Sequence, residues 1–396
     1  MASPGTRQGM AGYSPALWTV LAGNFIVQTG FGAILPLLPQ FVRHRGFPLA
    51  DMGAMAAAYA AVSFLGQLGA GPMADRWGRK VFMVAGSGME ALGTAGFLMH
   101  AAPWWYILCR ILQGLGSAAV VPAANALVAD VVPEDRRGRA YGLMGAAGSA
   151  GFAIGPMLGG LAGALWGLAA PFAIGVGLNA AAALVSLLLL PAGRRPVQRQ
   201  RLAAHTVRPL LGILWPYFWV MFAWMGLTGM YDTAWSLYMQ YLGATKWVIG
   251  LSFTLFSGPL LLLQIFGGKA ADRAGRRPLM VFGLALQTLT LTFYVVSHSA
   301  WLSIGVSMVE AAAMSLIGPS LSASVMDRSP KELHGAVQGW YQASGTLGAA
   351  LLALASGPLL VGHPNHPFIL GAAVMLVTTI GAAVMWKPWR ADSQKL

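Results

Sequence analysis

Four ionisable side chains lie well inside long apolar stretches of the sequence, where charged residues are rare. They are the carboxyl groups of Glu90, Asp232 and Glu310 and the guanidinium of Arg110. Placing a charge in such surroundings is costly, so we expect each group to face the protein interior or a wet cavity and to have a partner there. Because loss of water favours the neutral form of a carboxyl group, the three acids are candidates for exchanging protons or binding a cation.

The residues that other chemistries need are missing from the sequence. The single Cys109 excludes a disulfide framework, and the seven histidines lie near loops or span ends without the spacing of a zinc site. There is no phosphate-binding loop and no nucleophile elbow. We therefore expect no metal, no bound cofactor and no enzymatic activity. A membrane enzyme or receptor, the alternative from a different class, would need a polar catalytic cluster that three scattered acids do not provide.

The composition indicates that most of the chain does not face water. Hydrophobic residues make up 57% of the 396 positions and charged residues 9%, where a soluble protein has about 25% charged residues. Runs of roughly 20 apolar residues have the length that crosses a bilayer as a helix. Twelve such runs occur, at 15–38, 50–73, 80–100, 103–129, 138–165, 168–191, 212–240, 247–267, 278–297, 300–325, 334–358 and 366–387. The sequence predicts an all-α polytopic membrane protein.

The basic residues follow the loops in a regular way. All but four of the 25 lysines and arginines lie at the termini and in alternate loops, the exceptions being Arg43, Arg45, Arg110 and Lys246. The positive-inside rule then places both termini in the cytoplasm. The net charge of +13 is explained by this topology without a nucleic-acid partner. The absence of a cleavable signal peptide and of N-x-[ST] sites fits a bacterial inner (plasma) membrane.

The two halves of the chain repeat each other at an offset of 197 residues (272 − 75 for the first pair). The matched pairs are Asp75/Asp272, Pro122/Pro319, Asp130/Asp327, Pro133/Pro330, Gly138/Gly335, Gly142/Gly339, Gly148/Gly345 and Gly151/Gly348. So many matches in one register predict two pseudo-symmetric six-helix bundles with a cavity between them. We expect the first bundle at 1–191, a cytoplasmic linker at 192–209 and the second bundle at 210–396.

Three motifs carry a resemblance to a known family. The stretch GPMADRWGRK (71–80), with its counterpart at 268–277, resembles the loop signature of the major facilitator superfamily, and RILQGLGSA (110–118) resembles its fourth-helix motif. GFAIGPMLGG (151–160) is similar to the fifth-helix motif of the drug–proton antiporters in that superfamily. The resemblance implies a monomeric secondary transporter that uses a proton gradient and acts by alternating access.

The resemblance also implies a charged gate on the cytoplasmic side, closed in the outward-facing state. Glycines in the first motif allow a close helix approach and a tight turn. The residues implied are Gly71, Asp75, Arg76, Gly78, Arg79, Asp130, Arg136 and Arg137, with Asp272, Arg276 and Asp327 as a weaker mirror set.

In this superfamily the first, fourth, seventh and tenth helices line the cavity, which implies roles for Asp232 and Glu310 on the seventh and tenth. Glu90 falls on an outer helix, where a proton site and a structural role are equally open. Arg110 either bonds backbone carbonyls or, as the resemblance favours, biases a nearby carboxyl group. Where many drug–proton antiporters have an acid in the first helix, this chain has neutral amides. The expected cavity residues are Asn24, Gln28, Gln113, Phe222, Trp224, Tyr231 and Trp235.

The fifth-helix motif combines a proline with small residues. Pro156 removes one backbone hydrogen bond and kinks the span. We expect the glycines to pack against the facing half; they are Gly151, Gly155, Gly159 and Gly160.

These features together favour proton-coupled efflux, by antiport, of lipophilic or cationic small molecules. The alternative with the same fold is a facilitator or exporter of sugars, metabolites or lipid-linked glycans. Membrane lipid and the small-molecule substrate are the expected partners.

Overall fold

The computed structural model describes residues 14–133, 136–191, 204–330 and 333–384, and only the backbone at 68, 71–72, 75, 138, 204–211, 264–274 and 334–336. These parts contain helices and no strand. The long helices are α1 Pro15–Ile34, α3 Met52–Trp77, α4 Arg79–Leu98, α5 Pro103–Val131, α6 Arg137–Trp166, α7 Ala170–Leu189, α8 Ala204–Tyr241, α9 Lys246–Ala274, α10 Arg276–Val296, α11 Ala300–Asp327, α12 His334–Gly362 and α13 His366–Val384. The short helices are α2 Leu38–His44 and η2 Leu49–Asp51. All twelve long helices are apolar enough to cross a membrane, which confirms the prediction of twelve spans.

Two glycines make the sharp turns that separate consecutive spans. Gly78 has φ +101° between α3 and α4, and Gly275 has φ +87° between α9 and α10. Residues with a side chain rarely adopt this conformation, so glycine is required at both turns. The two positions differ by the repeat offset of 197 (275 − 78), so the same device ends the second span of each half.

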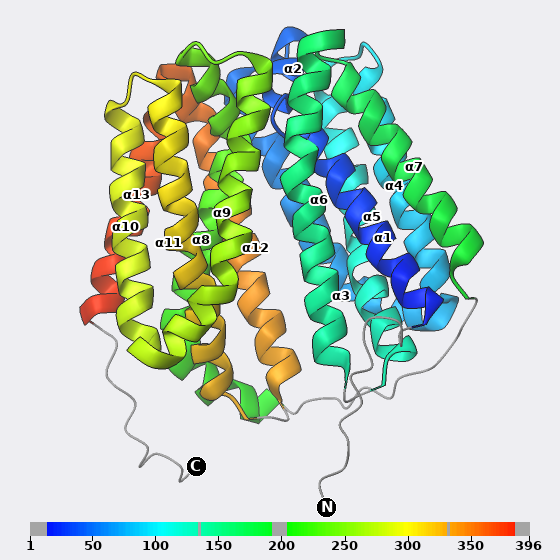
Figure 1. Ribbon diagram of the computed structural model, residues 1–396, viewed down its shortest axis with the longest axis vertical. Helices are drawn as coiled ribbons and strands as arrows, with labels where there is room; N and C mark the ends of the chain where they lie inside the picture. The colour runs from blue at the N-terminus through cyan, green and yellow to red at the C-terminus, as the bar shows by residue number, and fades with distance from the viewer. Residues whose placement is uncertain (1–13, 134–135, 192–203, 331–332, 385–396) are drawn as a thin grey trace, which may run out of the picture.

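The helices form two bundles of six long helices each, α1 with α3–α7 and α8–α13 (Figure 1). Within the first bundle α1 packs against α6, and within the second α8 packs against α12, its equivalent pair. This confirms the predicted fold class. The helix α8 already begins at Ala204, inside the segment 192–209 that we expected to be a linker. The bounds of the two domains stay a prediction.

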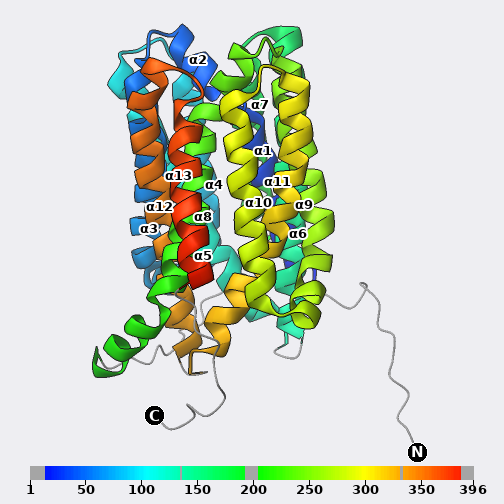
Figure 2. The same ribbon diagram turned by 90° about the vertical axis from the view of Figure 1, so that its left-hand side faces the viewer.

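The positive charges separate the two ends of the bundles. At one end, here named the basic end, lie the described cations Arg76, Arg79, Lys80, Arg136, Arg137, Arg139, Arg276, Arg277 and Arg328. The other end, here named the opposite end, carries α2 and η2 and the described cations Arg43, Arg45 and Lys246. Figure 2, turned by 90°, shows the helices running between these two ends.

The bundles contact each other at the opposite end through a duplicated glycine crossing. There α6 packs against α9, and α12 packs against α3. A Cβ added to Gly160 would lie 2.8 Å from the Cα of Gly250, and one added to Gly357 would lie 2.8 Å from the backbone nitrogen of Gly53. Gly250 and Gly53, like Gly357 and Gly160, differ by 197 residues (250 − 53). The two crossings are therefore symmetry mates, and only glycine permits their closeness.

Towards the basic end the bundles are separated. Thr254 Oγ1 donates to the backbone oxygen of Ala153 at 2.7 Å, near the middle of α6 and α9. Closer to the basic end Gly142, Gly145 and Gly339 are exposed, and a Cβ added to any of them would meet nothing within 4 Å. Figure 1 shows the corresponding parts of α6 and α12 apart. At these glycines no described residue of the facing bundle lies within that distance.

The expected partner of the fifth-helix glycines was wrong for three of the four. Gly151 and Gly155 pack against the backbone of α1 around Thr29, and Gly159 against Ala33, all within the first bundle. A spacing of four residues keeps these three glycines on one face of α6. Pro156 and Gly160 lie one position further on, on the adjoining face, and this face contacts Gly250 of the second bundle.

Candidate functional site

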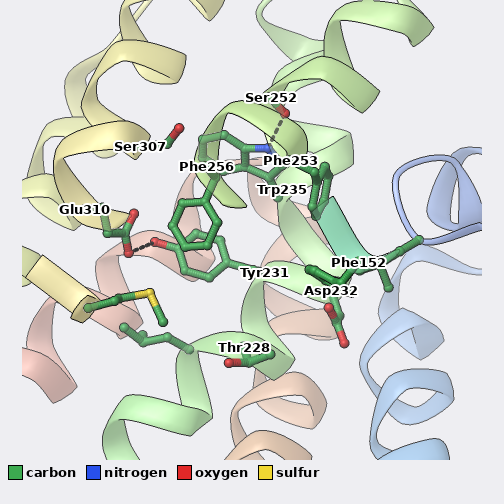
Figure 3. A pocket seen from close by; sticks show the side chains of 13 residues that line it. Phe152, Thr228, Tyr231, Asp232, Trp235, Ser252, Phe253, Phe256, Ser307 and Glu310 are labelled. Atoms are coloured by element: carbon green, nitrogen blue, oxygen red, sulfur yellow. Dashed lines mark hydrogen bonds between the residues drawn. The ribbon is translucent and has the colours of Figure 1, made fainter. Parts of the chain in front are cut away.

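A cavity lies between the bundles and has an aromatic lining (Figure 3). Its cavity volume is about 100 Å³, within about 630 Å³ of non-atom space that includes open solvent. Most of its wall belongs to the second bundle, and the first bundle contributes Leu35 and Phe152. The lining residues are Leu35, Phe152, Leu227, Thr228, Tyr231, Asp232, Trp235, Ser252, Phe253, Phe256, Ser307, Glu310 and Met314.

Helical spacing explains how the second bundle presents these side chains. On α8 the residues at 228, 231, 232 and 235 follow the i, i+3, i+4, i+7 pattern of one helix face. On α11 the lining residues Ser307, Glu310 and Met314 are three and four positions apart, which again is one face. The two predicted carboxyl groups thus come to the same cavity from two neighbouring helices.

Glu310 lies in the wall of the cavity, 1% exposed, and accepts three hydrogen bonds. Its Oε1 accepts from the Tyr231 hydroxyl at 2.5 Å and from Gln287 Nε2 at 3.2 Å, and its Oε2 accepts from the Tyr294 hydroxyl at 2.9 Å. All three donors are neutral, and none of the described cations forms an ion pair with this carboxyl group. The site therefore satisfies a carboxylate by hydrogen bonds alone.

The Oε1 atom of Gln287 is buried and has no hydrogen-bond partner among the described residues. A carboxylate only accepts hydrogen bonds, whereas a protonated carboxyl group also donates one. If the Gln287 amide turns over, its free oxygen takes the place of its nitrogen and can accept the proton of Glu310. The same side chain can thus serve both protonation states of the acid.

An aromatic cluster holds the wall around Glu310 in place. The ring of Trp235 lies against those of Tyr231 and Tyr294 in edge-to-face contacts at 5.8 and 5.2 Å, and Phe368 packs against all three. Trp235 Nε1 donates to Ser252 Oγ at 2.9 Å. This bond fixes the indole, so the ring of Trp235 is a rigid part of the cavity.

Asp232 follows Tyr231 in sequence. Its carboxyl group and that of Glu310 lie on opposite sides of the Tyr231 ring (Figure 3). The side chain of Asp232 is half-buried and forms no hydrogen bond or ion pair with any described residue. It faces the first bundle, where it interacts electrostatically with Arg110. A half-exposed acid beside aromatic rings is suited to attract a cationic group.

Arg110 lies inside the first bundle and is 2% exposed. Its guanidinium carbon sits 4.4 Å from the ring centre of Tyr59 and 5.9 Å from that of Phe31, and its Nη1 donates to Gln113 Oε1 at 3.2 Å. Gln113 in turn donates to Thr94 Oγ1 at 2.9 Å. The Nε of Arg110 has no described hydrogen-bond partner. Arg110 thus acts on Asp232 through space, without an ion pair.

Five of the expected cavity residues do not line this cavity. Gln113 is buried beside Arg110, and Asn24 Nδ2 donates to the backbone oxygen of Met144 at 2.8 Å, within the first bundle. Gln28 is half-buried and is not among the lining residues. The ring of Phe222 stacks on Trp219, and that of Trp224 packs against Gly318 of α11. The rings of Phe222 and Trp224 pack nearer the basic end. Of the seven residues expected in the cavity, Tyr231 and Trp235 therefore line it.

Glu90 lies on α4, away from the cavity lining. It is 8% exposed, its Cγ packs where a Cβ on Gly116 would be, and its carboxyl group forms no hydrogen bond or ion pair with a described residue. Its electrostatic neighbour is the Tyr59 hydroxyl, which also interacts with Arg110. Both expected roles of Glu90 stay open.

The described part of the predicted gate consists of one ion pair in each bundle. Arg79 pairs with Asp130, and Arg276 pairs with Asp327, again 197 residues apart. Each pair joins two helices of the same bundle, so neither bridges the bundles in this arrangement. Arg76 is exposed, while Arg136 and Arg137 are half-buried beside the end of α5. The side chains of Asp75 and Asp272 lie outside the described residues, and Gly71 is described by its backbone alone.

We expect Asp130→Ala to lower the free energy of unfolding by about 2–3 kcal/mol. The reason is that Arg79 is 4% exposed and would keep its charge in a buried place without this carboxylate. The measurement is thermal unfolding in detergent. The matched control is Asp327→Ala, because the equivalent pair is 30% and 55% exposed and should contribute about 1 kcal/mol or less. Equal losses in both variants would contradict this prediction.

Tyr294 and Gln287, the two further donors to Glu310, are not among the site residues predicted from the sequence. They lie seven residues apart on α10, which places them on one face of the helix. The available signal was Gln287, the one amide in the span at 278–297. Lining residues such as Phe152 and Met314 gave no signal, because apolar residues are expected throughout a membrane helix.

Twelve apolar helices in two bundles, with an acid-containing cavity between them, define a membrane transport protein. The family model of the Major Facilitator Superfamily matches residues 20–235 and 217–395, and the chain belongs to this family. It is thus a multi-pass membrane protein of a family of transporters.

Several curated relatives match along nearly their full length. Multidrug resistance protein 2 of Bacillus subtilis is 27% identical over 390 residues, covering 95% of this chain and 96% of the relative. The class C tetracycline resistance protein of Escherichia coli is 27% identical and covers 91% and 95%. The quinolone resistance protein NorA of Staphylococcus aureus is 22% identical and covers 90% and 92%.

Solved structures share the fold at low sequence identity. The nucleoside transporter NupG superposes with a TM-score of 0.77 at 14% identity, covering 94% of this chain and all (100%) of that chain. The human organic anion transporter MFSD10 gives a TM-score of 0.64 at 19% identity, covering 93% and 99%. At such identities the likeness concerns the fold alone.

Proposed function

We propose that this protein is a proton-coupled exporter of lipophilic or cationic small molecules. The observation that carries the proposal is Glu310, a buried carboxyl group in the wall of an aromatic cavity, bonded only by neutral donors. None of the described cations forms an ion pair with it, so the group can gain and lose a proton as its surroundings change. The relatives named as multidrug, tetracycline and quinolone resistance proteins support export of such molecules.

The cavity suits substrates with an apolar body and a positive charge. Phe152, Trp235, Phe253 and Phe256 supply apolar and aromatic surface, and Asp232 supplies one half-exposed negative charge. Neutral lipophilic molecules would use the rings alone. The two acids then divide the work: Asp232 attracts the charge of the substrate, and Glu310 carries the proton.

Transport would proceed by rotation of the bundles about their contacts. In the present arrangement the bundles touch at the opposite end and are apart at the basic end. The reverse arrangement would close the basic end, where the gate charges lie, and open the other. Substrate and proton each shift the balance between these arrangements only by their different affinities for the two.

The distribution of charge supports an orientation with the basic end in the cytoplasm. The cavity would then face the cytoplasm in the present arrangement, which is the side where an exporter takes up its substrate. We further propose that the protein is a monomer in the bacterial plasma membrane. It would be driven by the proton gradient without a bound cofactor, with substrate and lipid as its partners.

The proposal predicts that purified protein in lipid vesicles moves dyes and lipophilic cations only when a pH gradient is imposed. The measurement is fluorescence of a panel of such dyes after a pH jump, with a protonophore added at the end to abolish the transport. Protein-free vesicles and vesicles without a gradient are the controls. Flux that is the same with and without the gradient would instead support the facilitator of sugars, metabolites or lipid-linked glycans.

A further inference from the structure

Among the described residues, Tyr231 alone both lines the cavity and hydrogen-bonds to Glu310. Its hydroxyl donates to Oε1 at 2.5 Å, which is the length typical of a bond between a hydroxyl and a charged carboxylate. The other two donors, Tyr294 and Gln287, are each 0% exposed and do not line the cavity. Tyr231 is therefore the described donor to Glu310 that also borders the cavity.

The bond to Glu310 is the described polar contact of the Tyr231 side chain, whose ring also packs against Trp235 and Phe368. The Tyr231 hydroxyl has no described hydrogen-bond partner other than Glu310. Trp235, by contrast, is tied to Ser252 on α9 and is 5% exposed. The ring of Tyr231 is half-buried and one side of it borders the cavity. If the bond to Glu310 weakens, the ring can turn into the space that a substrate would occupy.

The strength of the bond depends on the charge of Glu310. Hydrogen bonds to a charged group are roughly twice as strong as those between neutral groups. Protonation also turns one carboxyl oxygen into a donor, and the partnerless oxygen of Gln287 is a ready acceptor on α10. The charged acid thus holds Tyr231 against α11, whereas the protonated acid binds it weakly.

We propose that Tyr231 is a proton-controlled gate inside the cavity: the charged Glu310 holds its ring aside, and protonation releases the ring into the substrate space. This inference rests on the proposed function and supplies its coupling step. Substrate and proton would compete through one movable side chain. By linkage, a bound substrate that keeps the ring aside favours loss of the proton, which is the relation an antiporter needs.

The other titratable groups around the site are few. On α8 they are Tyr231, Tyr238 and Asp232, and on α10 Tyr294, while no titratable side chain of the described parts of α9 or α12 bonds to Glu310. Asp232 interacts electrostatically with Arg110 and forms no hydrogen bond with Tyr231 or Glu310. Because Asp232 is itself a titratable group that attracts cations, the variants below are compared in an Asp232→Asn background, where a pH effect that passes through Tyr231 is separated from one that passes through Asp232.

The test measures the affinity for tetraphenylphosphonium in lipid nanodiscs between pH 5.5 and pH 8.5. The Asp232→Asn protein should bind about tenfold or more weakly at the acidic end. Tyr231→Phe keeps the ring without its bond to Glu310, so it should bind weakly and equally at all pH values. Tyr231→Ala removes the ring, so it should bind at acidic pH about as well as at alkaline pH.

Tyr294→Phe is the matched control, because it removes one hydroxyl from the same carboxyl group without altering the cavity. It should still bind more weakly at acidic than at alkaline pH, although the loss of one donor to Glu310 shifts the pH at which the affinity changes. The gate is refuted if Tyr231→Phe keeps that dependence, if Tyr294→Phe loses it equally, or if Tyr231→Ala abolishes binding. A wild type whose pH-driven transport is intact but whose affinity does not change with pH also refutes it, whereas absence of any pH-driven transport would refute the proposed function itself.

Discussion

Vesicles containing Glu310→Gln should show no transport driven by a pH gradient, although the protein still binds substrate. Glutamine has nearly the shape of the acid and keeps a hydrogen-bonding carbonyl, but it cannot gain or lose a proton. Transport should fall to the level of protein-free vesicles. Binding should become independent of pH and should match the wild type at low pH, because the amide imitates the protonated acid. The measurements are dye efflux after a pH jump and titration with the same dye.

Asp232→Asn distinguishes the two acids of the cavity. Asp232 has no described hydrogen-bond partner and lines the cavity. Loss of its negative charge should therefore weaken binding of cationic substrates. Transport of a neutral lipophilic substrate should continue to follow the pH gradient. The reverse outcome, with coupling lost in Asp232→Asn and kept in Glu310→Gln, would assign the proton to Asp232.

Gly250→Val should shift the protein strongly away from the arrangement with a closed opposite end. A Cβ at Gly250 would be 2.8 Å from the Cα of Gly160 and would also meet the backbone oxygen of Pro156, and backbone atoms cannot move aside as a flexible side chain can. Overpacking of this kind costs about 1–3 kcal/mol, which changes the ratio of two states by roughly tenfold to a hundredfold. Transport should fall accordingly.

Distances between spin labels at the opposite end give the direct measurement. Ala169 of the first bundle and His298 of the second are exposed there and can be replaced by labelled cysteines after Cys109→Ser. In Gly250→Val the distribution should move to longer distances. The control is Gly258→Val, two turns further along α9, where a Cβ would meet nothing within 4 Å. An unchanged distribution in Gly250→Val, or the same change in the control, would contradict the crossing as a steric contact.

Most of the fold could be predicted because membrane helices can be recognised in a sequence by their length and their apolar composition. The offset of 197 residues also pointed to the symmetry that the structure repeats at Gly160 with Gly250 and Gly357 with Gly53. What a spacing cannot give is the rotation of a helix relative to its neighbours. The glycines at 151, 155 and 159 were correctly placed on one face, but that face meets α1 rather than the other bundle.

The same limit applies to the cavity. Asp232 and Glu310 stood out because an acid in an apolar span needs a special environment, and the structure places both in the cavity lining. Phe222 and Trp224 are aromatic like Tyr231 and Trp235, yet packing within the second bundle occupies them. Tyr294 and Gln287 became visible only when α10 and α11 were seen side by side, because the bonds to Glu310 join residues distant in the sequence.

Glu310 and its three donors all belong to α8, α10 and α11, whereas the first bundle supplies Leu35 and Phe152 to the described wall of the cavity. The residues that bind the proton and the residues that shape the facing wall can therefore change independently in evolution. Replacements on the facing wall would broaden or narrow the range of exported compounds and leave the coupling to protons unchanged. A lineage exposed to new toxins would accordingly change Phe152 on α6 or Leu35, directly after α1, before it altered Glu310 or its donors on α10.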